Sequence, residues 1–173
     1  MTNFIVDVEA DGPCPGLYSM VSFGAVLLSD HTKTFYGQLA PISDKWIPEA
    51  LAVSGHTREQ TLAFDSPKKV MDDFASWILI NTPAGRRPMF WSDNNGFDWQ
   101  FINYYFHAYY GYNPFGHSSR NIGDLYKGLD RNVFSNFKHL RQTKHTHHPV
   151  DDAKGNAEAL ITMRSKFNLK MPI

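Results

Sequence analysis

Two carboxylates lie two residues apart in the segment Asp7-Val8-Glu9, near the N-terminus of the chain. The preceding residues are apolar and β-branched, so residues 3–9 predict a buried strand. Side chains two residues apart on a strand project from the same face, and both acids would therefore point together. Because paired buried carboxylates repel each other and are costly to desolvate, this pattern is compatible with a site for a hard divalent cation such as Mg²⁺ or Mn²⁺, although by itself it is a weak signal. Two exposed acids at a strand end are the alternative interpretation.

A further acid, Asp98, follows a short apolar run at residues 89–91 that predicts another buried strand. Residues 96–98 then open a predicted helix, and open α/β sheets bind their ligands at such strand-to-helix junctions. Asp98 also suits a capping role at the start of that helix, and the aromatic residues around it also suit the core. By itself, this segment leaves a structural and a functional interpretation open.

The segment 147–153, His-His-Pro-Val-Asp-Asp-Ala, places His147 in a predicted loop and Asp152 in the first turn of the last predicted helix. Imidazole titrates close to neutral pH, so His147 can take the proton of an attacking water molecule. Asp152 can complete the group of carboxylates. The alternatives are an acidic pair, Asp151 and Asp152, that stabilises a helix N-terminus, and a solvated histidine-rich loop.

The order of the predicted elements indicates an α/β fold with a mixed central sheet flanked by helices. Strands follow one another closely in the first part of the chain and predict an antiparallel meander, whereas helices and strands alternate afterwards. The predicted strands span residues 3–9, 20–28, 34–39 and 89–91, and the predicted helices span residues 66–78, 96–105, 125–129 and 151–166.

Length and composition favour one ordinary globular domain over residues 1–173. The only cysteine is Cys14, which excludes an intrachain disulfide and a cysteine-based zinc site and favours a reducing compartment. We see neither a signal peptide nor an apolar stretch that could span a membrane, so we expect a cytoplasmic protein without a membrane partner.

Charge is unevenly distributed although lysine plus arginine and aspartate plus glutamate both number 17. Residues 120–148 carry six basic and two acidic side chains, a balance of +4, whereas the first twelve residues carry three acids and no base. This distribution suits a cation site beside a strip that binds phosphates, and chance scatter of surface charge is the alternative.

Together, the three motifs resemble the DEDDh family of 3′→5′ exonucleases, which includes oligoribonuclease, RNase T and proofreading subunits. The resemblance extends over nearly the whole chain, and residues 7–13 resemble RNase AS-like exoribonucleases in particular. The residues that match the three family motifs are, in order, Asp7 with Glu9, Asn94 with Phe97 and Asp98, and His147 with Asp152.

The resemblance implies an RNase H-like fold and a single 3′–5′ exonuclease domain over residues 1–173. It implies that two divalent cations, Mg²⁺ or Mn²⁺, are held by Asp7, Glu9, Asp98 and Asp152, and that His147 deprotonates water. The expected products are nucleoside 5′-monophosphates, cut from single-stranded RNA or DNA 3′ ends, and the resemblance favours RNA. It also implies a homodimer. Asn94, His56 and the backbone of Ala10 are the expected substrate contacts.

Three positions depart from the family pattern. Ala10 stands where many relatives carry threonine, so sugar recognition would depend on backbone groups. Asp93 stands where many relatives carry histidine. His148 directly follows His147, but only His147 has the family spacing to Asp152.

Other function classes fit the sequence less well. A nucleic-acid-binding module without catalysis would be expected to have lost at least one of the five catalytic candidates, and all five are present. A zinc protein would use His139, His145, His147 and His148, but their spacing fits no closed site and no cysteine contributes. Nothing positive indicates a purely structural domain.

Overall fold

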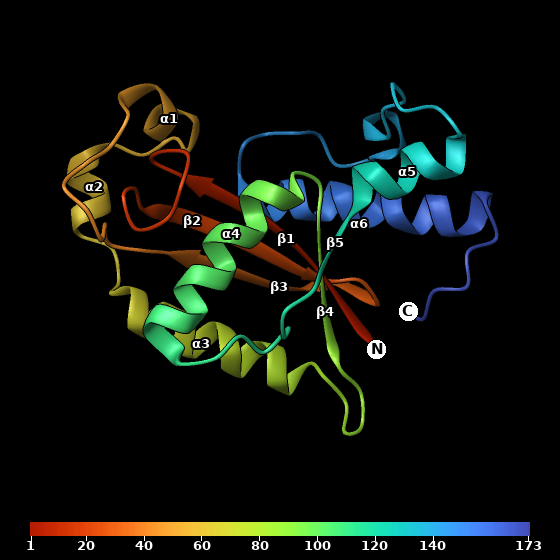
Figure 1. Cartoon of the computed structure of the whole chain (residues 1–173), viewed down its shortest axis with the longest axis horizontal. Coiled ribbons are helices and arrows are strands. Elements are labelled where there is room, and N and C mark those ends of the chain that lie inside the picture. Colours follow the sequence, from red (N-terminus) through yellow and green to blue (C-terminus); the bar gives the residue numbers. More distant parts are fainter.

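A five-stranded mixed sheet with the strand order β3-β2-β1-β4-β5 forms the centre of the computed structural model, which describes residues 1–173. The first three strands form the predicted antiparallel meander, and β4 and β5 extend it in parallel with β1 (Figure 1). The strands are β1 (Thr2–Ala10), β2 (Met20–Leu27), β3 (Asp30–Gln38), β4 (Pro88–Ser92) and β5 (Ser119–Asn121).

The helices cover both faces of the sheet and build a core on each side (Figure 1). Helices α3 and α4 pack on one face, and α5 and α6 pack on the other. The helices are α1 (Pro48–Val53), α2 (Arg58–Leu62), α3 (Pro67–Ile80), α4 (Asn95–Tyr105), α5 (Ile122–Asp130) and α6 (Pro149–Lys166). A π-helical turn η1 (Phe106–Tyr110) extends α4, and a short 3₁₀ turn η2 (Lys138–Leu140) precedes α6. No helix is both long and apolar enough to cross a membrane.

Strand β1 alternates between the two cores, as its sequence pattern predicts. Phe4, Val6 and Val8 belong to the core beneath α3 and α4, whereas Ile5 belongs to the core beneath α5 and α6. Because side chains alternate along a strand, Asp7 and Glu9 continue the row of Ile5. Both acids therefore lie on the face of the sheet that α6 covers.

Several elements differ from the sequence-based expectation. The third strand is longer than predicted, and α6 begins at Pro149 instead of at residue 151, with His148 at the N-cap position. Strand β5 was not predicted because Ser119-Arg120-Asn121 has no apolar residue whose alternation would reveal it. It is fixed by Asn95, whose amide donates to the carbonyl of Arg120 and whose amide oxygen accepts from Ser119.

The N-terminus of α6 packs directly on β2 at Gly24, the residue that pairs with Asp7. A Cβ atom at Gly24 would lie 2.4 Å from both the carbonyl carbon of Pro149 and the amide nitrogen of Val150. Only a glycine leaves room for this contact. It brings the first turn of α6, with Asp152, next to the acids of β1.

Replacing Gly24 with alanine is expected to destabilise the fold by about 1–3 kcal/mol, the usual cost of overpacking, and to move α6 away from β1. Urea unfolding measures the free energy. Gly128→Ala is the matched control, because nothing lies within 4 Å of a Cβ there and alanine is favoured inside a helix. Equal stability of Gly24→Ala and the wild type would show that this contact does not position α6.

Candidate active site

Three of the predicted acids meet at the end of β1. Asp7 and Glu9 project from this strand, and Asp152 comes from the first turn of α6. One carboxylate oxygen from each of the three lies within 4.8 Å of the others. The structure therefore gathers residues that are up to 145 positions apart in the chain around one point.

Asp98 joins this group from the opposite layer of the fold. It lies in the first turn of α4, it is buried, and its Oδ1 accepts a hydrogen bond of 3.2 Å from the backbone N–H of Val8, the residue between the two acids of β1. The Oδ2 atoms of Asp98 and Asp152 are buried and have no hydrogen-bond partner in the protein. Buried acceptors of this kind are costly unless a cation satisfies them, so the site fits divalent metal ions.

Burial and mutual repulsion raise the pKa of three carboxyl groups at this site. Burial is the main cause for Asp7, and the neighbouring Asp98, Asp152 and Glu9 add to it, against an opposing effect of Arg141. Burial and the charge of Asp152 raise the pKa of Glu9 to about 7. Burial also raises the pKa of Asp98 well above its ordinary value, against the opposing effects of Ser92 and of the hydrogen bond from Val8. The ionised cluster therefore needs positive charge beside it.

The loop before α6 brings two histidines to the cluster. His147 Nδ1 lies 4.0 Å from Glu9 Oε1, and His147 has a left-handed backbone with φ of 59°. His145 Nδ1 lies 2.7 Å from Asp152 Oδ1, and the two imidazole rings are 4.2 Å apart and edge to face. His148 turns away, with its ring 4.7 Å from that of Tyr36 on β3.

The involvement of His145 was missed by our sequence-based reasoning, which considered it only for the zinc alternative. No family motif includes the position, and its spacing to Asp152 has no meaning until the loop conformation is known. The local abundance of histidines is the only sequence signal that points to it.

The three expected substrate contacts have different surroundings. Asn94 lines a cleft of about 440 Å³ together with Asn121, Lys127 and Lys138. Ala10 is buried beside Glu9, where the pairing register with β2 shifts. The Nε2 of His56 lies 3.3 Å from Nε2 of Gln38 and 3.5 Å from the hydroxyl of Tyr36, so this histidine faces β3.

Asp93, which replaces the histidine of many relatives, holds a buried arginine beside the site. The Oδ2 of Asp93 accepts a hydrogen bond of 3.2 Å from a terminal nitrogen of Arg141, and it lies 3.8 Å from Nζ of Lys138. Arg141 also donates to Oδ1 of Asn156 on α6 at 2.5 Å, and 7% of its side chain is exposed. The guanidinium supplies positive charge close to Asp7.

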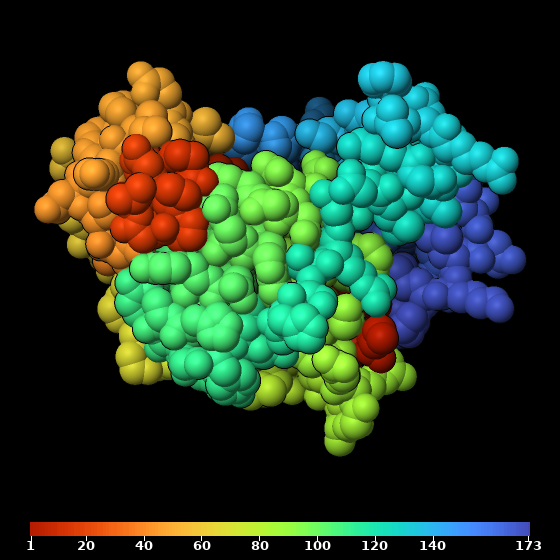
Figure 2. All heavy atoms as spheres, viewed as in Figure 1, coloured from red at the N-terminus to blue at the C-terminus, as the bar shows by residue number.

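The basic residues of segment 120–148 do not form one continuous strip. Arg141 is buried, and Lys127 and Lys138 line the cleft beside Asn94. Arg120 instead lies over the ring of Trp91, 5.1 Å from its centre, in a separate pocket with Met1. Figure 2 shows the upper edge of the molecule hollowed between a part that contains α1 and α2 (orange) and one that runs from α5 to η2 (cyan).

Comparison with known proteins identifies a relative by sequence. The chain is 43% identical over 126 residues to the 3′-5′ DNA exonuclease Cap18 of Escherichia coli, a match that covers 72% of this chain and 67% of that protein. No family model matches the chain.

Solved structures share the fold at low identity. The nuclease domain of 3′hExo, a DEDDh family member bound to rAMP, superposes with a TM-score of 0.77 at 18% identity and covers 99% of this chain and 96% of that one. The zinc-bound E. coli exonuclease I complex with single-stranded DNA has a TM-score of 0.73 at 18% identity. It covers 95% of this chain, which spans only 40% of that enzyme. These similarities confirm the RNase H-like fold.

The metal-free protein is expected to lose stability as the pH rises from about 5 to 8. Between the ordinary pKa of 4.5 and the folded value of about 7, Glu9 keeps a proton that the unfolded chain releases, so raising the pH favours unfolding. Above the folded value, Glu9 causes no further loss. Buried Asp7 and Asp98 act in the same direction. Urea unfolding in EDTA across this range measures the slope.

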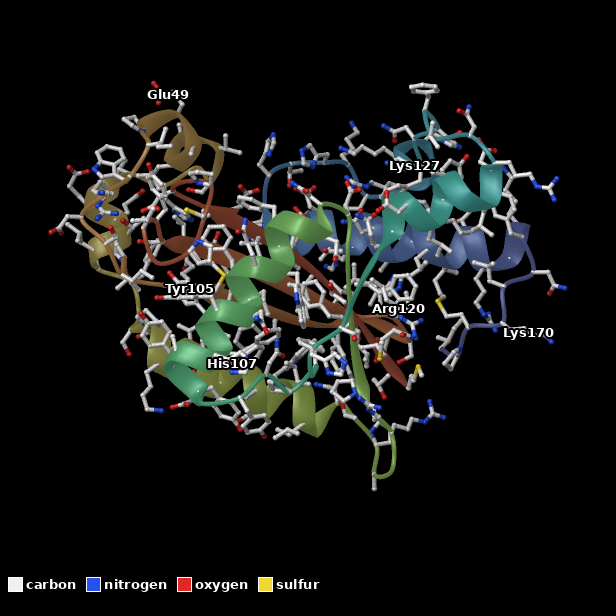
Figure 3. All side chains as sticks on the ribbon, viewed as in Figure 1. Glu49, Tyr105, His107, Arg120, Lys127 and Lys170 are labelled. Atoms are coloured by element: carbon white, nitrogen blue, oxygen red, sulfur yellow. The ribbon has the colours of Figure 1, made fainter.

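Glu9→Gln should reduce the slope of stability against pH. The control Glu49→Gln replaces an exposed acid on α1 (Figure 3) and should leave that slope unchanged. Mn²⁺ at a hundred times its dissociation constant should restore about 2.7 kcal/mol at pH 8. An identical slope in wild type and Glu9→Gln would contradict the assignment of the raised pKa to Glu9.

Proposed function

Because this chain belongs to the DEDDh family of 3′–5′ exonucleases, we propose that it shortens single-stranded DNA from the 3′ end and releases nucleoside 5′-monophosphates. One geometric observation carries the proposal: Asp7 and Glu9 of β1 meet Asp152 of α6 beside His147. The chain in which they meet is a relative of a 3′-5′ DNA exonuclease. Asp98 completes the set by its hydrogen bond to β1.

Asp7, Glu9, Asp98 and Asp152 would hold two divalent cations, Mg²⁺ or Mn²⁺. Support comes from the buried, unpartnered oxygens of Asp98 and Asp152 and from the raised pKa of Asp7, Glu9 and Asp98, since each indicates carboxylates gathered without enough positive charge. When bound, such cations neutralise the carboxylates and polarise the scissile phosphate.

His147 is the proposed general base. Its side chain is half exposed and faces Glu9, so it can reach a water molecule between the carboxylates and the solvent. General-base catalysis by a positioned imidazole is typically worth about 10²–10⁴ in rate. His145 is already hydrogen-bonded to Asp152, which leaves His147 as the freer of the two rings.

The cleft beside Asn94 is the proposed path of the substrate backbone. Lys127 and Lys138 line it, and so does Asn121, which caps the N-terminus of α5. Lysine side chains and a helix N-terminus both favour phosphate groups. We also keep Asn94, His56 and the backbone of Ala10 as proposed contacts to the 3′-terminal nucleotide.

DNA is the proposed substrate in place of the RNA that the sequence resemblance favours. The relative with 43% identity is a DNA exonuclease, whereas the structures with rAMP and with a histone mRNA stem-loop are 18–19% identical to this chain. RNA is the alternative substrate, and the relative rates of cutting DNA and RNA distinguish the two. A single exonuclease domain over residues 1–173, a homodimer and a cytoplasmic location stay predictions.

The direct test uses 5′-labelled single-stranded DNA and RNA of one sequence with Mg²⁺, Mn²⁺ or EDTA. We expect a ladder of products shortened from the 3′ end, faster on DNA and absent in EDTA. Asp98→Asn should lower the rate at least about 100-fold, because even loss of an outer-shell partner of a metal commonly costs about 10–100-fold. The control Asp72→Asn removes an exposed acid on α3 and should retain the wild-type rate.

A faster ladder on RNA would reverse the proposed sugar preference and leave the enzyme class intact. Oligonucleotides that stay uncut with every metal, although the protein binds them, would replace the exonuclease proposal by a binding module without catalysis.

A further inference from the structure

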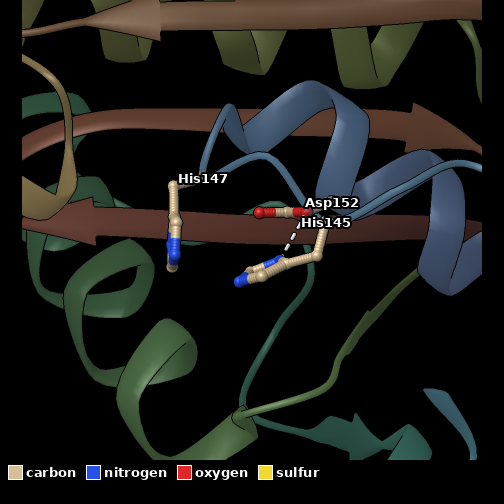
Figure 4. Close-up of side chains that lie close together, drawn as sticks. All are labelled: His145, His147 and Asp152. Carbon is tan, nitrogen blue, oxygen red and sulfur yellow. Dashed lines mark hydrogen bonds and ion pairs between the residues drawn. The ribbon is translucent and has the colours of Figure 1, made fainter.

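A second group of metal-binding side chains lies beside the four carboxylates. His145 and His147 from the loop and Asp152 from α6 each offer one ligand atom within 4.8 Å of the others. Figure 4 shows the carboxylate of Asp152 directed between the two imidazoles, with a hydrogen bond to His145. This group shares only Asp152 with the proposed site for Mg²⁺ or Mn²⁺.

The donor set of this group differs from that of the carboxylate cluster. Carboxylate oxygens suit Mg²⁺ and Mn²⁺, whereas imidazole nitrogens suit Zn²⁺ and its neighbours in the first transition row. Two histidines and one carboxylate, with a further position open to water, form a common set of protein ligands for zinc. The chemistry therefore points to a different metal from the one that the exonuclease reaction uses.

The geometry requires only a small adjustment. Zinc bonds of about 2.0–2.1 Å place tetrahedral ligand atoms about 3.3 Å apart. His145 Nδ1 and Asp152 Oδ1 are already 2.7 Å apart, and His147, with 53% of its side chain exposed, is free to rotate toward them. Asp152 is the fixed member, because only 1% of its side chain is exposed and its Oδ1 accepts a hydrogen bond from the backbone N–H of Thr146. Its buried Oδ2 has no protein partner and is available to a cation.

The two other histidines of the zinc alternative lie elsewhere. The Nδ1 of His139 lies 2.9 Å from the carbonyl oxygen of Asn136, and its ring packs against Tyr126. His148 packs against Tyr36. The structure thus groups His145 and His147 with Asp152 and separates His139 and His148 from them, a grouping that the spacing of the histidines did not predict.

We infer that His145, His147 and Asp152 form a zinc site, and that Zn²⁺ bound there inhibits the exonuclease. The inference of inhibition rests on the proposed function, because zinc would bind both the proposed base His147 and the proposed metal ligand Asp152. The binding of zinc does not depend on that proposal. Nearby Glu9 adds negative charge that favours a cation at this position.

Zinc binding to the metal-free protein is measured first, by competition with a chromogenic chelator and without nucleic acid. His145→Ala and His147→Ala should each weaken binding more than about tenfold, since even outer-shell changes commonly cost about 10–100-fold. Asp98→Asn should retain binding. The control His107→Ala, which removes an exposed histidine of η1 far from the loop (Figure 3), should match the wild type.

Two further variants separate ligation from a structural effect of losing the hydrogen bond to Asp152. His145→Cys supplies a thiolate that zinc accepts and should restore binding, whereas His145→Asn keeps a polar side chain and should not. A zinc affinity of His145→Ala equal to that of the wild type would overturn the site. So would a His145→Cys protein that is as resistant to urea as the wild type and still does not regain zinc affinity.

Inhibition is measured next, with DNA, fixed Mg²⁺ and rising free Zn²⁺, and each variant is compared with its own zinc-free rate. His145→Ala should need more than about tenfold more zinc than the wild type for half inhibition. Equal inhibition of both proteins would overturn the inhibitory role while leaving the binding result intact. Absence of any exonuclease activity would overturn the proposed function, and the binding assay would still decide the zinc site.

Discussion

Repulsion among four closely grouped carboxylates, two of them buried and two half-buried, is the constraint on which the rest of this structure depends. Asp7, Glu9, Asp98 and Asp152 lie close together, and burial and mutual charge both favour the protonated forms of Asp7, Glu9 and Asp98. Such an arrangement destabilises the metal-free fold, so it must be held by contacts elsewhere. The row of side chains on β1, the close contact at Gly24 and the fixed start of α4 supply those contacts, and Arg141 offsets part of the charge.

Local patterns were sufficient to predict the elements that carry the acids. The period of two along β1 predicted that Asp7 and Glu9 share one face of the sheet, and the structure places both beneath α6. Ser66 caps α3 and is followed by proline at its first turn, which is the expected signal for that helix. The antiparallel meander and the mixed sheet followed from the order of the elements. The family resemblance brought the distant motifs together, which no local pattern does.

Features that depend on tertiary contacts were not predictable in the same way. Strand β5 has no apolar residue and exists because β4 and Asn95 pair with it. The buried position of Arg141 depends on Asp93 and Asn156, which are remote in sequence. His145 reaches Asp152 only through the conformation of the loop, in which His147 has a left-handed backbone. Composition alone suggested a basic strip, whereas the structure separates Arg120 from the lysines of the cleft.

The proposed role of the four gathered carboxylates is to hold divalent cations. The most direct measurement is anomalous diffraction from crystals soaked in Mn²⁺ with a nucleoside 5′-monophosphate. We expect two manganese peaks about 4 Å apart, in contact with Asp7, Glu9, Asp98 and Asp152. Manganese that contacts neither Asp7 nor Asp98 at saturating concentration would contradict this role, because the cost of burying these two acids would then have no cation to explain it.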